Sequence, residues 1–216
     1  MKKALIVWGG WDGHQPKEVG ELCADILRTQ DFEVMLSHDL AALTEQDLNT
    51  FSLLVPIWTM GEISQDQVKA VAKAVESGLG VGGCHGGMCD AFRGSPEWHF
   101  ITGAQWVSHP GDDGVEYDVH ITDHSHPITA GLSDFKVKSE QYYLHTDPAN
   151  KVLATTKFPV ADGPHVPNGE CHIPVVFTRL YGKGKVFYCA LGHQAATIAS
   201  GEPYEIMKRG LAWAAR

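Results

Sequence analysis

The stretch Val81–Asp90, with the sequence VGGCHGGMCD, is the most informative part of this chain for its fold. It continues a short apolar run that begins at Leu79, and pairs of glycines flank a cysteine and a histidine. Glycines are needed around the tip of a sharp strand-to-helix turn, because neighbouring Cβ atoms would clash with its strained backbone. The pattern therefore predicts a buried strand over 79–83 that turns at once into a helix.

Two frames of this turn place different side chains at its tip. Residues 82–86 read GxCxG and are centred on Cys84, whereas residues 83–87 read GxHxG and are centred on His85. Spacing alone does not choose between them. A cysteine at the tip would make the chain a hydrolase or amidase, with Cys84 as nucleophile and His193 as base.

Strands and helices alternate around this turn in the first half of the chain. Short continuous apolar runs are typical of strands buried on both faces of a parallel sheet, and they predict strands over 4–8, 32–36, 52–57 and 79–83. Apolar residues at helical spacing predict helices that begin near Pro16 and at Ser64, where Gln67 completes a capping box. Pro56 should end the pairing of the third strand. The alternation predicts an α/β fold with a mostly parallel sheet and helices on both faces.

The second half of the chain is richer in predicted strands. These cover 115–121, 151–155, 174–180 and 185–191, with a hairpin turn at 182–184, a long loop at 161–170 and a final helix from about Pro203. No linker or repeat interrupts the pattern. We therefore treat residues 1–216 as one domain.

Composition limits the partners and the location that we expect. The formal net charge is −9 and no basic cluster occurs, which argues against nucleic acid and anionic membranes and favours a neutral small molecule. No stretch approaches the roughly 20 apolar residues of a membrane span. The five cysteines form no CxxC pair, as expected for free thiols in a reducing cytoplasm. Whether the chain forms a homo-oligomer is left open.

Several motifs, taken in order along nearly the whole chain, resemble the ThuA (trehalose-utilisation) family. They are WGGWDGHQP, GVGGCHGG, HFITGAQWVSH, HPITAGL, SEQYYLH and PVVFTRLYGKGKVFYCALGH. The resemblance implies a flavodoxin-like three-layer αβα sandwich related to the class I glutamine amidotransferases. It also implies a histidine where amidotransferases have their cysteine, so His85 should be at the tip and Cys84 should face the interior.

We do not expect this chain to hydrolyse glutamine, although its fold should be related to that of the amidotransferases. An amidotransferase triad needs a histidine after a C-terminal strand and a glutamate two positions later. His193 is in place, but Ala195 stands where the glutamate would be. The carboxylate that would orient the histidine in such a triad is therefore missing.

The candidate site residues follow predicted strand ends or glycines, or lie in family-like motifs. Open α/β sheets bind ligands at the carboxyl ends of their strands, and Glu140 lies in a segment that resembles a D-E-x-Y-type motif of the family. The candidate catalytic residues are His85, Glu140, His193 and, in the alternative frame, Cys84. The candidate substrate-binding residues are Trp11, His14, His109, Tyr142 and His145. We expect His14, His85, Glu140 and His193 to converge on one pocket.

The sequence does not identify a cofactor. No HxxxH or HExxH spacing indicates a divalent metal, although a discontinuous site built from His14, His85, Glu140 and His193 remains open. By resemblance, the substrate is a disaccharide such as trehalose or an oxidised derivative. His85, Glu140 and His193 would supply acid/base groups for an enzyme acting on it. A binding module that retained the pocket without the chemistry is a third possibility.

Overall fold

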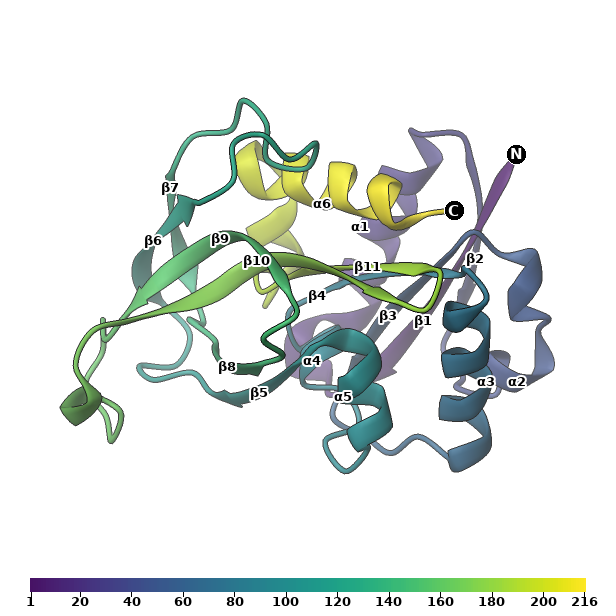
Figure 1. Cartoon of the computed structure of the whole chain (residues 1–216), viewed down its shortest axis with the longest axis horizontal. Helices are drawn as coiled ribbons and strands as arrows, with labels where there is room; N and C mark the ends of the chain where they lie inside the picture. The colour runs from purple at the N-terminus through teal and green to yellow at the C-terminus, as the bar shows by residue number, and fades with distance from the viewer.

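A nine-stranded sheet with the order β2-β1-β3-β4-β11-β10-β9-β6-β7 forms the centre of the molecule (Figure 1). The computed structural model describes all residues, 1–216. The strands of this sheet are β1 (Lys2–Gly10), β2 (Phe32–Ser37), β3 (Leu53–Thr59), β4 (Gly80–Cys84), β6 (Val115–Ile121), β7 (Phe135–Ser139), β9 (Lys151–Phe158), β10 (Cys171–Tyr181) and β11 (Gly184–Cys189). A separate two-stranded sheet pairs β5 (Ala104–Ser108) with β8 (Tyr143–Thr146).

The large sheet is parallel in one half and antiparallel in the other. Neighbouring strands from β2 to β11 run parallel, whereas β11, β10, β9, β6 and β7 pair antiparallel. The prediction of a mostly parallel sheet is therefore right for the first half and wrong for the second. At the junction, β10 and β11 are joined by the tight turn at Gly182 and Lys183, and so short a connection permits only antiparallel pairing.

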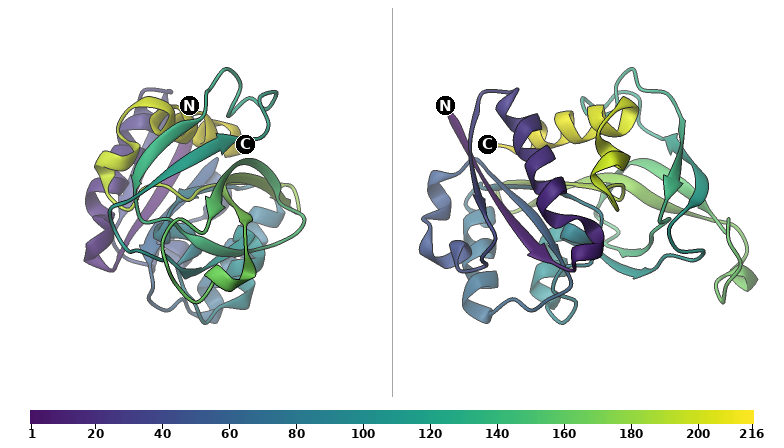
Figure 2. Two further views of the ribbon diagram at one scale, coloured as in Figure 1. Left: turned by 90° about the vertical axis from the view of Figure 1, so that its left-hand side faces the viewer. Right: turned by 180° about the vertical axis from the view of Figure 1, so that it is seen from behind.

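Helices cover both faces of the sheet and complete three layers, as the fold class predicted from the sequence requires. The helices α1 (Pro16–Arg28) and α6 (Gly201–Ala214) pack together on one face (Figure 2). The opposite face carries α3 (Gln65–Glu76), α4 (Gly86–Cys89) and α5 (Pro96–Thr102), with the short α2 (Ala42–Glu45) beside α3. Both bonds of the capping box predicted at Ser64 and Gln67 are present. No helix is both long and apolar enough to cross a membrane.

Pro56 lies inside β3 and affects the two neighbours of this strand differently. Pairing with β4 stops after Leu54, whereas pairing with β1 continues to Thr59. The prediction that pairing ends near Pro56 is thus correct on the β4 side and wrong on the β1 side. Proline has no N–H to donate, but β3 no longer pairs with β4 at position 56, so no hydrogen bond between these strands is lost there. The strand therefore continues beside β1 and carries Thr59 to the carboxyl edge of the sheet.

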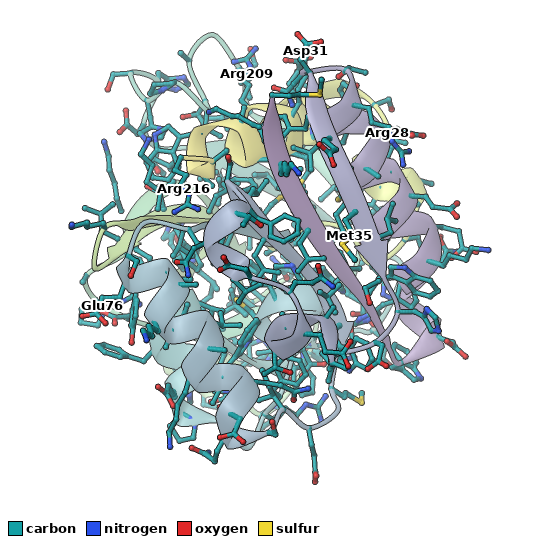
Figure 3. The ribbon with its side chains drawn as sticks, turned by 90° about the vertical axis from the view of Figure 1, so that its right-hand side faces the viewer. Arg28, Asp31, Met35, Glu76, Arg209 and Arg216 are labelled. Carbon is teal, nitrogen blue, oxygen red and sulfur yellow. The ribbon has the colours of Figure 1, made fainter.

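Two features mark the periphery of the sheet. Figure 3 looks at the β2 edge, where Met35 is 38% exposed and Arg28 lies on the neighbouring α1. At the far side, the segment between β9 and β10 projects from the body of the molecule (Figure 1). This segment contains the loop predicted over 161–170 and a short 3₁₀ helix, Val166–Asn168.

Replacement of Gly210 by alanine should destabilise the protein. A Cβ atom there would lie 2.2 Å from the Phe187 ring, so α6 would have to move away from β11. Such overpacking costs about 1–3 kcal/mol, which outweighs the gain of up to about 1 kcal/mol from better helix propensity. Chemical denaturation measures the difference. The matched control is Gly94→Ala, because a Cβ atom at Gly94 meets nothing within 4 Å and should change stability by less than about 0.5 kcal/mol. Equal effects would contradict this packing.

Candidate metal centre

His85 occupies the tip of the turn that follows β4. Its backbone has φ 46° and ψ −138°, a conformation that is strained for a residue with a side chain. The last strand holds this turn, since the His85 N–H donates to the carbonyl oxygen of Cys189 at 2.7 Å and the Tyr188 hydroxyl donates to the His85 carbonyl at 3.2 Å. A Cβ atom at Gly86 would lie 2.5 Å from the His14 ring, so this glycine permits the close approach of the two histidines.

Cys84 faces away from the tip and into the protein interior. It is the last residue of β4, so its side chain points opposite to that of His85. The side chain is 1% exposed, and the neighbouring Cys23 thiol together with burial raises the pKa of Cys84 well above its ordinary value. A buried, protonated thiol does not fit a nucleophile. The position of Cys84 therefore gives no support to the alternative in which this residue attacks a substrate.

Four side chains from distant parts of the chain converge beside His85. One ligand atom from each of His14, His85, Glu140 and His193 lies within 4.8 Å of every other, and all four residues are buried. The histidines follow β1, β4 and β11, whose carboxyl ends share one edge of the parallel half of the sheet. Glu140 directly follows β7, so the antiparallel half supplies the carboxylate.

Each imidazole of this cluster has one ring nitrogen next to an oxygen atom outside the cluster. The distances are 2.8 Å from His14 Nδ1 to Thr59 Oγ1, 2.8 Å from His85 Nδ1 to the Ala190 carbonyl and 3.6 Å from His193 Nε2 to Asp113 Oδ2. The other ring nitrogens face the same atom, Glu140 Oε2. These distances are 3.6 Å for His14 Nε2, 3.1 Å for His85 Nε2 and 3.4 Å for His193 Nδ1.

The cluster is ionised in an unusual way. Burial alone would raise the pKa of Glu140, but the three imidazoles hold it well below its ordinary value, so the carboxylate is charged. Burial lowers the pKa of His85 to about 4, so its ring is neutral at pH 7. Because the Ala190 carbonyl only accepts, the single proton is on Nδ1, and the Nε2 lone pair faces the carboxylate at 3.1 Å. The His85 Nε2 lone pair and the Glu140 carboxylate repel each other at this distance, and a positive charge between them would remove the repulsion.

The pKa of His193 shifts in the opposite direction from that of His85. The hydrogen bond to Glu140 raises the pKa of His193, against the effect of its partial burial. The Glu140 carboxylate therefore favours the protonated form of this ring. Its Nδ1 atom is nevertheless buried without a hydrogen bond of good geometry. A cation placed between this nitrogen and Glu140 would satisfy both groups.

Most of the predicted substrate-binding residues lie around the cluster. Tyr142 stacks on His85 with ring centroids 3.8 Å apart, and Trp11 contacts His14 edge-on at 4.7 Å while remaining 46% exposed. His109 Nε2 is 3.9 Å from Glu140 Oε1. His145 is an exception, because it lies on the exposed side of β8, the opposite side from the buried Leu144. The structure therefore does not bring His145 into the buried cluster.

Two residues that the sequence did not indicate lie next to the outer ring nitrogens of the histidines, Thr59 beside His14 and Asp113 beside His193. Thr59 ends β3 at the same sheet edge, so the strand-end rule that selected the histidines could have selected it. Asp113 lies in the loop between β5 and β6, and no sequence pattern indicates its position. It is the carboxylate next to His193, although no glutamate stands at position 195. The interaction thus comes from a loop distant in the sequence.

The His85 ring should titrate at a pH of about 4 in metal-free protein, well below the ordinary value of 6.5. The unfolded chain takes up a proton near pH 6.5 and the folded chain does not. The contribution of His85 to the free energy of unfolding should therefore decrease as the pH falls from 6.5 towards 4 and stay constant below that. NMR of the labelled ring measures the titration. Glu140→Gln should lower the His85 pKa further, because the carboxylate raises it. A His85 pKa at or above 6.5 would contradict the described environment.

The native protein should react with a thiol reagent mainly at Cys171. Cys171 is partly exposed, whereas Cys23, Cys84, Cys89 and Cys189 are buried. We expect about one fast-reacting thiol per chain at pH 8, with the others reacting after unfolding. Cys171→Ser is the matched control and should abolish the fast phase. Rapid labelling of Cys84 would instead revive the hydrolase alternative.

Comparison with known proteins identifies the family. A family model described as "Trehalose utilisation" matches residues 3–214. A ThuA-like protein from Parabacteroides merdae is 21% identical with a TM-score of 0.76, covering 99% of this chain and 89% of that chain. One from Bacteroides uniformis is 16% identical with a TM-score of 0.77, covering 99% and 91%. A β-galactosidase from Bacillus circulans is 13% identical with a TM-score of 0.64, covering 99% of this chain but 30% of the enzyme.

These structural likenesses, all at low identity, show a shared fold. Among curated protein sequences, none matches the chain significantly. The family match covers nearly all of the sequence, and the solved ThuA-like proteins share the architecture described above. The chain therefore belongs to the ThuA, or trehalose-utilisation, family.

Proposed function

We propose that this chain is a metal-dependent enzyme that acts on a sugar or an oxidised sugar. In this proposal, His14, His85, Glu140 and His193 hold one divalent transition-metal ion. The observation that carries it is the orientation of the three imidazoles, each of which has one nitrogen beside an outer oxygen atom and directs the other at Glu140 Oε2. Metal-binding histidines are oriented in this way by partners of their second nitrogen.

The spacing of the donor atoms supports a metal ion. Zinc lies about 2.0–2.1 Å from nitrogen and oxygen ligands, which places the ligands of a tetrahedral site about 3.4 Å apart. The three nitrogens lie 3.1, 3.4 and 3.6 Å from Glu140 Oε2. A set of three nitrogens and one oxygen suits Zn²⁺, and Fe²⁺, Mn²⁺ or Ni²⁺ are the other ions to compare.

Such an ion would supply a Lewis acid for a sugar carbonyl or hydroxyl oxygen. His85, Glu140 and His193, expected from the sequence to be acid/base groups, would then be ligands. Proton transfer falls to a residue at the rim. His109 fits this position, because its side chain is 28% exposed and its Nε2 is 3.9 Å from Glu140 Oε1. The family's description as trehalose utilisation supports a carbohydrate as the substrate.

Metal analysis tests the centre directly. The purified protein should bind one equivalent of Zn²⁺ after treatment with EDTA, and binding should raise its melting temperature. His14→Ala, His85→Ala, His193→Ala and Glu140→Gln should each weaken binding by about 100-fold or more, because each removes a ligand. Asp113→Asn removes only the partner of one ligand and should cost about 10-fold. Calorimetric titration of each variant measures these affinities.

His145→Ala is the matched control for this experiment. It removes an exposed histidine outside the cluster and should leave affinity and stoichiometry unchanged. Wild-type protein that binds none of the four metal ions would refute the centre, as would an equal loss in His145→Ala. A second experiment tests whether the protein is a metal-dependent enzyme. Trehalose and its keto derivatives are incubated with metal-loaded and with EDTA-treated protein, and mass spectrometry measures their conversion. Equal conversion by both forms would refute metal dependence.

A further inference from the structure

The segment that carries Glu140 crosses from the large sheet to the small one without a main-chain hydrogen bond. Glu140, Gln141 and Tyr142 connect β7 to β8, belong to no helix or strand and are each buried. None of them takes part in a hydrogen bond between main-chain groups. Buried main-chain groups normally find partners, so side chains must hold this segment instead. Its position matters because Glu140 supplies the only carboxylate of the candidate metal centre.

The Tyr117 hydroxyl provides one of these side-chain contacts. Tyr117 lies on β6 with its side chain buried, and its hydroxyl donates to the main-chain carbonyl of Glu140 at 3.0 Å. This bond acts on the main chain at the residue whose carboxylate meets the three imidazoles. Tyr188 makes the equivalent contact with the His85 carbonyl at 3.2 Å. A buried tyrosine thus holds the main chain at one ligand from each half of the sheet.

The Gln141 side chain attaches the same segment to the neighbouring strand. Its Nε2 atom donates to Thr156 Oγ1 at 2.7 Å and to the Lys157 carbonyl at 3.0 Å, both on β9. Gln141 is 0% exposed, so loss of these bonds would leave buried polar groups without partners. Because β6 and β9 are adjacent in the sheet, Tyr117 and Gln141 fix the segment to two neighbouring strands.

We propose that Tyr117 and Gln141 are positioning residues, which place the Glu140 carboxylate against the three histidines of the metal centre. Neither residue belongs to the four-residue cluster, and both act through the main chain of residues 140 and 141. Metal–ligand distances are held to within about 0.2 Å, so a small shift of this segment changes how well the ligands fit an ion. The inference rests on the proposed function and names further residues on which its metal affinity depends.

Metal affinity and ligand geometry together test this role. Tyr117→Phe and Gln141→Met keep the approximate size of each side chain and remove its hydrogen bonds, so each should weaken Zn²⁺ binding by about tenfold. Calorimetric titration measures the affinities. When Co²⁺ replaces Zn²⁺, both variants should also show an altered visible absorption spectrum, because this spectrum depends on the arrangement of the ligands. A role confined to folding would lower the melting temperature and leave the Co²⁺ spectrum unchanged.

Leu153→Val is the matched control for these variants. Leu153 is fully buried on β9, but it lies three positions before Thr156, so its side chain is on the opposite face of the strand. Its melting temperature should fall, while the Zn²⁺ affinity and the Co²⁺ spectrum should equal those of the wild type. Wild-type affinity and spectrum in one variant would overturn the role of that residue, and in both variants would overturn the proposal. An equal loss of affinity in Leu153→Val would also overturn it.

Crystal structures of the metal-free variants separate this proposal from the proposed function. In Tyr117→Phe and Gln141→Met, the Glu140 carboxylate should move away from the histidines by about 0.5 Å or more. In Leu153→Val, Glu140 Oε2 should stay within 3.6 Å of the three ring nitrogens. A wild-type protein that binds none of the four metal ions would refute the proposed function, and these structures alone would then decide the positioning role. An unmoved carboxylate in both variants would overturn that role.

Discussion

The buried charge of Glu140 is the constraint on which the centre of this structure depends. Removing a carboxylate from water is costly unless other groups compensate for it, and here three imidazoles surround one oxygen at 3.1–3.6 Å. Hydrogen bonds with Thr59 and the Ala190 carbonyl fix the orientations of His14 and His85, and Asp113 lies 3.6 Å from His193. These contacts of the second ring nitrogens therefore help to place three imidazoles around a single buried negative charge. A divalent ion bound between the four side chains would balance this charge most fully.

The two halves of the sheet make different contributions to this arrangement. The parallel half brings the ends of β1, β3, β4 and β11 to one edge, where His14, Thr59, His85 and His193 follow. The antiparallel half and its loops add Glu140, Asp113, His109 and Tyr142 from the other side. Within the parallel half, Gly86 has no side chain, so the His14 ring lies close to the turn and to the His85 ring. The site exists only at the junction of the halves.

The shared fold explains little of the chemistry by itself. ThuA-like proteins and a segment of a β-galactosidase have the same architecture at low sequence identity, and such a scaffold supports many activities. The chemistry of this chain depends on the side chain at the strained turn after β4. His85 takes that position and Cys84 points inward, so the turn presents an imidazole and not a thiol.

The sequence by itself determined the local elements: the buried strands, the capping box at Ser64, the glycine-rich turn and the placement of histidines after strand ends. These follow from short-range periodicity and backbone sterics, which residues close in the chain specify. Only the tertiary structure decided that Glu140 meets three histidines, that Asp113 lies near His193 and that His145 faces outward. It also decided the antiparallel pairing of β10 with β9, of β9 with β6 and of β6 with β7. Such contacts join residues many positions apart, and a single sequence carries no signal for which distant side chains the packed strands bring together.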